Sequence, residues 1–226
     1  MTGLTLTLVA AAASLGSVHT LAPDHWMPFA ALARAERWDA RRTALITALC
    51  GLGHVTVSVL LGLVSVFLGL ELLQALGRSL EGVAGFVLIA FGVAYGSWGL
   101  HRAVQARWHG HVHGHVHWHG GHAHAHPHAD GEGARMTPWM LFLIFCADPC
   151  VAVIPLMFAA APLGWGSTLA VVAAYEVATI GTMVALVLPA RAVATSVRGA
   201  WADRFGDALA GGVIAAVGIV VVSLGI

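Results

Sequence analysis

Few side chains within or at the ends of the apolar stretches of this sequence could do chemistry. Imidazole, carboxylate and thiolate groups are ligands of borderline divalent transition metals, whereas magnesium and calcium prefer oxygen ligands alone. We expect a metal site from six residues, the first four being the main ligands, and a seventh that is a ligand or a proton carrier. The six are His19, Asp24, His25, His54, Asp148 and Cys150, and the seventh is Glu176.

Some of these residues have a second interpretation. A lone buried histidine is often only hydrogen-bonded to a neighbouring helix, Asp148 precedes a proline and could cap a half-helix, and Cys150 could be a small buried apolar side chain. Cys50 and Cys146 are interpreted as packing residues, because all three cysteines lie within or beside apolar runs and a secreted disulfide framework is improbable.

The first motif needs a broken helix. On an ideal helix His19, Asp24 and His25 would point at about 0°, 140° and 240°, so a straight helix could not bring them together. Pro23 and Pro28 remove backbone donors and disfavour helical geometry at the residues before them. We therefore expect a break at this point, of the kind that transporters use for ion sites.

A second concentration of imidazole lies between the third and fourth apolar stretches. We interpret residues 101–137 as a disordered, cytoplasmic, low-complexity loop that captures metal ions weakly, although a neutral spacer or a tag has a similar composition. Its ten closely spaced histidines are His109, His111, His113, His115, His117, His119, His122, His124, His126 and His128.

The composition predicts a membrane protein. Of the 226 residues, 58% are hydrophobic and 10% are charged, and the mean hydropathy is +0.82, whereas soluble domains have roughly a quarter charged residues. The formal net charge is zero, so there is no basic field for nucleic acid, and the expected partners are a lipid bilayer and metal ions.

Six apolar stretches are each near the roughly 20 residues that a helix needs to cross a bilayer. We interpret the first as a retained span rather than a signal peptide, because it has no basic start. The resulting fold class is an all-α integral membrane protein, with residues 1–100 and 138–226 each forming a three-helix unit around the loop 101–137. The stretches are residues 4–21, 44–70, 82–100, 138–161, 167–190 and 206–226.

Arginines give an orientation, because cytoplasmic loops are enriched in positive residues. Ten of the eleven arginines follow the first, third or fifth stretch, and Arg78 alone lies on the other side. We therefore expect both termini outside the cytoplasmic membrane and the histidine-rich loop in the cytoplasm.

The two units resemble each other weakly. Pro23-Asp24 in the first unit corresponds to Asp148-Pro149 in the second. Each pair is followed by a polar residue in the next apolar stretch, which is His54 in the first unit and Glu176 in the second. With three spans per unit the orientations must be opposite, so we expect two inverted repeats with broken helices 1 and 4. The alternative is that proline-kinked helices are simply common in membranes.

These motifs resemble those of the nickel/cobalt efflux family and the related nickel–cobalt permeases. The segment from His19 to His25 is similar to the His-x4-Asp-His signature of the permeases, and Gly53-His54 is similar to the family's second-span histidine motif. Pro149-Cys150 and the histidine-rich loop resemble the efflux branch. The resemblance implies a six-span carrier of nickel or cobalt, and it gives no role for Glu176.

The expected function is secondary transport of divalent transition-metal ions, without a prosthetic group and without enzymatic activity. No Walker-type phosphate loop is present, and a loop that gathers ions in the cytoplasm favours efflux, driven by proton exchange. An uptake permease, a membrane thiol-redox relay and a metal-storage protein are the alternatives. Nickel or cobalt is the expected cargo, with zinc, iron or manganese also compatible with such ligands; the sequence predicts no oligomeric state.

Overall fold

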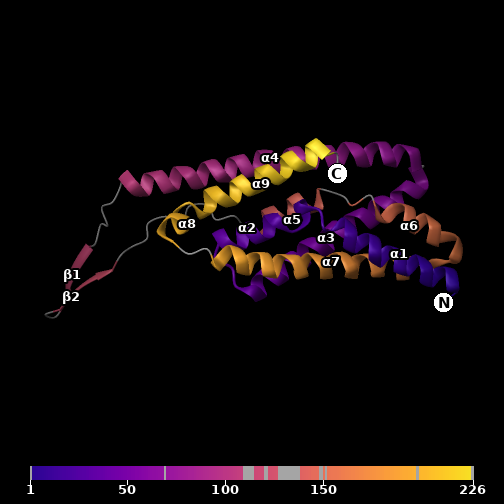
Figure 1. Cartoon of the computed structure of the whole chain (residues 1–226), viewed down its shortest axis with the longest axis horizontal. Helices are drawn as coiled ribbons and strands as arrows, with labels where there is room; N and C mark the ends of the chain where they lie inside the picture. The colour runs from indigo at the N-terminus through magenta and orange to yellow at the C-terminus, as the bar shows by residue number, and fades with distance from the viewer. Residues whose placement is uncertain are drawn as a thin grey trace.

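The computed structural model describes residues 2–68, 70–108, 115–119, 122–126, 138–147, 150, 152–196 and 199–224. Most of these residues are helical, and two short strands form one hairpin (Figure 1). The elements are α1 (Gly3–His19), η1 (Pro23–His25), α2 (Met27–Ala35), α3 (Ala40–Leu68), α4 (Leu70–Trp108), β1 (His115–His119), β2 (His122–His126), α5 (Pro138–Cys146), α6 (Val153–Ala160), η2 (Ala161–Leu163), α7 (Trp165–Ser196), α8 (Ala200–Arg204) and α9 (Gly206–Leu224).

Long apolar helices are the main feature of the described residues. Within them, Ala40–Val64 of α3 and the whole of α7 and α9 are long and apolar enough to cross a membrane, and α1 with α2 would add a fourth, bent span. Large apolar side chains face outward on these helices, for example Val177 on α7 at 71% exposed. Extensive apolar surface of this kind suits lipid contact, so the helices suggest insertion into a membrane.

The break predicted in the first apolar stretch is confirmed. α1 ends at His19, the short 3-10 helix η1 covers Pro23–His25, and α1 and the following helical segment are bent by 82° relative to each other. The cause is local: the carbonyl of His19 would bond to the N–H of residue 23 in a continuous helix, and Pro23 has none. That carbonyl instead accepts from the N–H of Ala22, at 3.1 Å.

The fourth apolar stretch is also divided. α5 ends at Cys146 and α6 begins at Val153, with Pro149 in the interval. A helix through this region would need the N–H of residue 149 for the carbonyl of Phe145, and a proline cannot provide it. The two segments in which a proline adjoins an aspartate in the sequence are therefore both interrupted.

Residues 101–137 differ from the expected disordered loop where the structure describes them. α4 continues as a helix through Trp108, and β1 pairs with β2 in an antiparallel register that sets His115 opposite His126 and His117 opposite His124. The dipeptide between the strands is Gly-Gly, which two-residue hairpin turns favour. His109, His111, His113 and His128 lie outside the described residues.

Glycines bring α9 into contact with part of the longer helix α4, and the two helices run side by side in Figure 1. A Cβ atom on Gly92 would collide with the backbone of Ala215, and a Cβ atom on Gly211 would collide with the backbone of Gly96. Small residues at such positions let helix backbones approach closely in membranes. α9 therefore packs directly against the backbone of α4 at glycine positions, without interlocking side chains there.

Two clusters of buried apolar side chains lie within the bundle. One contains Phe29, Phe145 and Ile214 from α2, α5 and α9, and the other contains Val55, Val153 and the ring of Tyr175 from α3, α6 and α7. α3 contributes to both clusters, through Ile46 and Cys50 in the first and Val55 in the second.

The Gly211 contact can be tested by adding one methyl group. Gly211→Ala should destabilise the protein by about 1–3 kcal/mol, as overpacking does, and lower its unfolding temperature in detergent. Gly212→Ala is the matched control, because a Cβ atom on Gly212 meets nothing within 4 Å and alanine favours the helix by about 1 kcal/mol. Equal unfolding temperatures for the two variants would contradict this account of the α4–α9 contact.

Candidate metal centre

The break after α1 brings the three residues of the first motif together. The rings of His19 and His25 are 4.4 Å apart between centroids, and Asp24 Oδ1 lies 3.0 Å from His25 Nδ1. Asp24 and His25 are buried, at 7% and 3% exposed. A carboxylate beside Nδ1 favours the imidazole tautomer with its proton on Nδ1, which leaves the lone pair on Nε2.

His54 reaches the same place from the middle of α3. Its ring centroid is 5.3 Å from that of His25, and its side chain is 1% exposed. His54 Nδ1 lies 3.2 Å from the carbonyl oxygen of Phe145. A carbonyl can only accept, so Nδ1 is the donor and Nε2 is left with an unprotonated lone pair. The carbonyl is available because residue 149, whose N–H would bond to it in a continuous helix, is a proline.

Unpartnered imidazole nitrogens are the clearest chemical signal in the described part of the chain. The Nε2 atoms of His19, His25 and His54 are all buried and have no hydrogen-bond partner among the described residues. A buried polar atom left in this way costs about 1–3 kcal/mol, and such atoms call for an explanation. A ligand that accepts lone pairs, such as a metal ion, would provide one.

Cys150 joins this group. His19, His54 and Cys150 each offer one ligand atom, and the three atoms lie within 4.8 Å of one another. With metal–nitrogen bonds of about 2.0–2.1 Å and metal–sulfur bonds of about 2.3 Å, tetrahedral ligand atoms lie roughly 3.3–3.6 Å apart. Modest side-chain rotations would therefore suffice for these residues to hold one ion, with the His25 ring beside it.

Two hydroxyl residues of this site are missing from the predicted set. Ser58 Oγ accepts a hydrogen bond from the backbone N–H of Cys150 at 2.6 Å and donates to the carbonyl of His54 at 2.8 Å. Tyr175 OH lies 2.6 Å from Cys150 Sγ. Both had a sequence signal: Ser58 is one helical turn after His54, and Tyr175 is a tyrosine in mid-span, where tyrosines are uncommon because they favour the membrane interface.

Two predicted residues, Asp148 and Glu176, remain to be placed. Asp148 lies outside the described residues. Glu176 follows Tyr175 on α7, but one residue rotates the side chain by about 100°, so it turns away while Tyr175 faces the site. Glu176 is only partly buried and is not among the groups whose ligand atoms converge.

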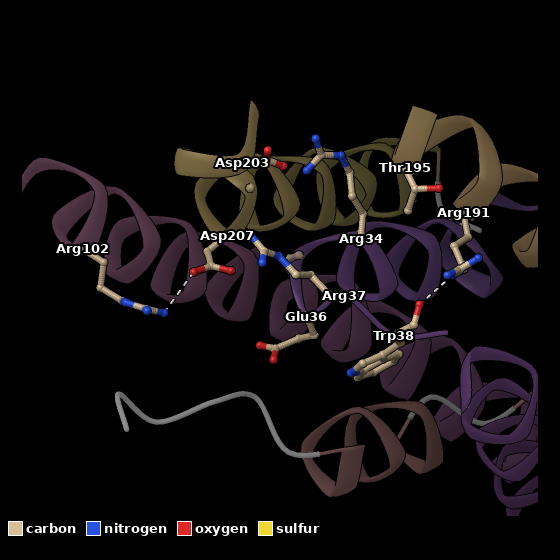
Figure 2. A pocket seen from close by; sticks show the side chains of 11 residues that line it. Arg34, Glu36, Arg37, Trp38, Arg102, Arg191, Thr195, Asp203 and Asp207 are labelled. Atoms are coloured by element: carbon tan, nitrogen blue, oxygen red, sulfur yellow. Dashed lines mark hydrogen bonds and ion pairs between the residues drawn. The ribbon is translucent and has the colours of Figure 1, made fainter. Parts of the chain in front are cut away.

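A polar cavity of about 760 Å³ lies at another part of the bundle, around the end of α2 (Figure 2). Tyr95 OH donates towards Glu36 Oε1 at 3.2 Å and Asp207 Oδ1 at 3.3 Å, and Arg102 Nη1 is 3.2 Å from Asp207 Oδ2. Figure 2 shows the labelled arginine side chains pointing in different directions. They do not converge on one anion.

Arginines around this cavity instead hold helix ends together. Arg34 Nε donates to the carbonyl of Ala194 at 2.7 Å, and Arg191 Nε donates to the carbonyl of Trp38 at 2.8 Å. The two bonds run in opposite directions between the α2 end and the α7 end. Carbonyls near helix ends have no intrahelical partners, and a guanidinium is well suited to pair with them.

Comparison with family models, with curated proteins and with solved structures finds no match to this chain. The interpretation of the centre therefore depends on its own geometry and on the sequence motifs.

The role of Ser58 can be tested by its replacement with alanine. Ser58→Ala leaves the buried N–H of Cys150 without its acceptor, so it should destabilise the protein by about 1–3 kcal/mol. Ser14→Ala is the matched control, because Ser14 Oγ also donates to the carbonyl four residues earlier but is exposed; its effect should stay within about 0.5 kcal/mol. The measurement is thermal unfolding in detergent, and equal shifts would refute a bridging role.

Proposed function

We propose that this protein is a secondary transporter of divalent transition-metal ions, with nickel or cobalt as the expected cargo. The observation that carries the proposal is a set of three buried imidazole Nε2 atoms beside a cysteine sulfur, at the break in an apolar helix; none of the three has a hydrogen-bond partner in the part of the chain that the structure describes. His19, His25, His54 and Cys150 would bind the ion. Asp24 would orient His25, as carboxylates do for metal-binding histidines.

The site combines features that a carrier needs. Breaks in membrane helices are tolerated where the freed backbone faces protein or a cavity, and transporters place ion sites there. Both breaks described above adjoin this site, since α1 ends at His19 and α5 supplies the carbonyl that holds His54. We further propose the six-span arrangement of two inverted three-helix repeats, in which these two breaks are equivalent.

Buried hydroxyl groups extend the polar interior beyond the ligands. Thr47 Oγ1 and Thr179 Oγ1 are buried without hydrogen-bond partners among the described residues. Thr47 lies two helical turns before His54 on α3, and Thr179 lies one turn after Tyr175 on α7. Such oxygens could replace part of an ion's hydration along a path to or from the site.

Export is the proposed direction. A divalent ion that moves through 100 mV changes its free energy by about 4.6 kcal/mol, so export against a negative interior needs coupling, and proton exchange is the proposed source. With the arginine-rich loops in the cytoplasm, the histidine-rich segment would gather ions on the loading side. Uptake is the second candidate, because entry down the same potential needs no coupling.

The ligand set predicts a specific loss of transport. His25→Ala, Asp24→Ala and His54→Ala should each abolish metal flux into or out of proteoliposomes, with little loss of protein from the membrane. Removal of His25 or His54 would leave the ion undercoordinated, and removal of Asp24 would leave His25 without the carboxylate that orients it. His101→Ala is the control, since His101 is exposed on α4 and contacts Gln105. A panel of divalent ions with an imposed pH gradient identifies cargo, direction and coupling, and full flux in any two of the three variants would overturn the assignment.

The histidine-rich segment predicts a different kinetic effect. Deletion of residues 108–128 should weaken the apparent affinity for metal while leaving the maximal flux and the order of metal preference unchanged, because tethered weak sites act by raising the local concentration. The measurement is flux against metal concentration on the loaded side. Loss of transport at saturating metal would show instead that the segment is part of the translocation mechanism.

A further inference from the structure

Tyr175 has an unusual position for a tyrosine in an apolar helix. The chain has two tyrosines, and this one lies inside α7, a helix with a mean hydropathy of 2.0 in its most apolar window. Its side chain is fully buried, at 0% exposed, and its hydroxyl group lies 2.6 Å from Cys150 Sγ. A buried phenol normally needs a hydrogen-bond partner, and here the partner is a sulfur that faces two histidines.

Metal binding would fix the direction of this hydrogen bond. In the metal-free protein either the thiol or the phenol can donate. A cysteine that ligates a metal does so as a thiolate, which only accepts, and its proton is released to solvent. The hydroxyl group of Tyr175 is then the donor, and its hydrogen bond to sulfur changes the electron density that the sulfur offers to the metal.

The surrounding contacts separate the role of Tyr175 from that of Ser58. Ser58 holds the backbone of Cys150 against the backbone of His54. Tyr175 contacts the sulfur itself, and comes from a different helix. α7 approaches α1 closely at this point. Glycine permits this approach, since a Cβ atom on Gly16 of α1 would lie 2.9 Å from the carbonyl oxygen of Tyr175.

We propose that Tyr175 is a positioning residue for metal selection. Its hydroxyl group donates to Cys150 Sγ, keeps the sulfur directed towards His19 and His54, and thereby makes the site prefer ions with affinity for sulfur, such as cobalt, nickel and zinc, over manganese. This inference rests on the proposed function, since it assumes that the cluster binds a metal ion.

Cobalt(II) is the probe, because a thiolate bound to cobalt gives a ligand-to-metal charge-transfer absorption that histidine does not give. The histidine-rich loop has no cysteine, so it cannot contribute to this absorption. The full-length protein in detergent should show the band, and Cys150→Ala should lack it. Tyr175→Phe should retain a weaker band at a shifted energy. The molar excess of Mn²⁺ that removes half of the band should be about tenfold to a hundredfold lower for this variant than for the wild-type protein.

Tyr95→Phe is the matched control, since it removes the same atom from the other buried tyrosine, which contacts Glu36 and Asp207. It should leave the band and the manganese excess unchanged. A double-mutant cycle on the affinity for cobalt, measured by competition with a chelator, completes the test: Tyr175→Phe should have no further effect in Cys150→Ala, because it acts through the sulfur.

The outcomes distinguish the role of Tyr175 from the proposed function in metal transport. An unchanged band energy and manganese excess in Tyr175→Phe, or additive losses in the double mutant, would overturn the role of Tyr175 while leaving metal transport intact. A wild-type protein that transports cobalt without a charge-transfer band would also overturn that role alone. A protein that neither binds nor transports any of the ions would overturn the proposed function as well.

Discussion

Three imidazole Nε2 atoms, buried without hydrogen-bond partners among the described residues, are the constraint on which the rest of this centre depends. Each costs about 1–3 kcal/mol as long as nothing binds to it, and the net stability of a domain is only about 5–15 kcal/mol. Part of the surrounding polar structure is satisfied: Ser58 bridges two backbone segments, and the carbonyl of Phe145 holds His54. Close helix packing supplies the rest of the stability.

Proline serves two purposes at this centre. Pro23 ends the first helix, so that side chains which would point in different directions from a straight helix meet at one place. Pro149 removes the donor that would have occupied the carbonyl of Phe145, so that the carbonyl can fix the tautomer of His54. The same chemical property, the missing N–H, creates the geometry of the first motif and fixes the tautomer of His54.

The sequence predicts the parts of the centre that depend on local chemistry. The break at Pro23, the convergence of His19 with His25, and the proximity of His54 to Cys150 follow from residue types and from the rule that polar residues in spans face inward. Tyr175 and Ser58 depend on how α3, α6 and α7 are rotated against each other. That rotation is fixed by packing at positions such as Gly16, and an apolar helix of nearly uniform composition has no periodic pattern that reveals it.

The length of α4 could not be predicted from the apolar stretches either, because the polar and charged residues near its ends are equally typical of loops. A helix of 39 residues is about 58 Å long, nearly twice the thickness of the hydrocarbon core. If residues 82–100 lie in the hydrocarbon, as the proposed six-span arrangement requires, the helix continues for about 12 Å beyond it, to Trp108. The electric field of an anionic lipid surface decays over about 8 Å at physiological salt. Because the headgroups add about 5–7 Å to each side of the hydrocarbon, the end of α4 would stand only about 5–7 Å above them, within the layer of cations that an anionic lipid surface attracts.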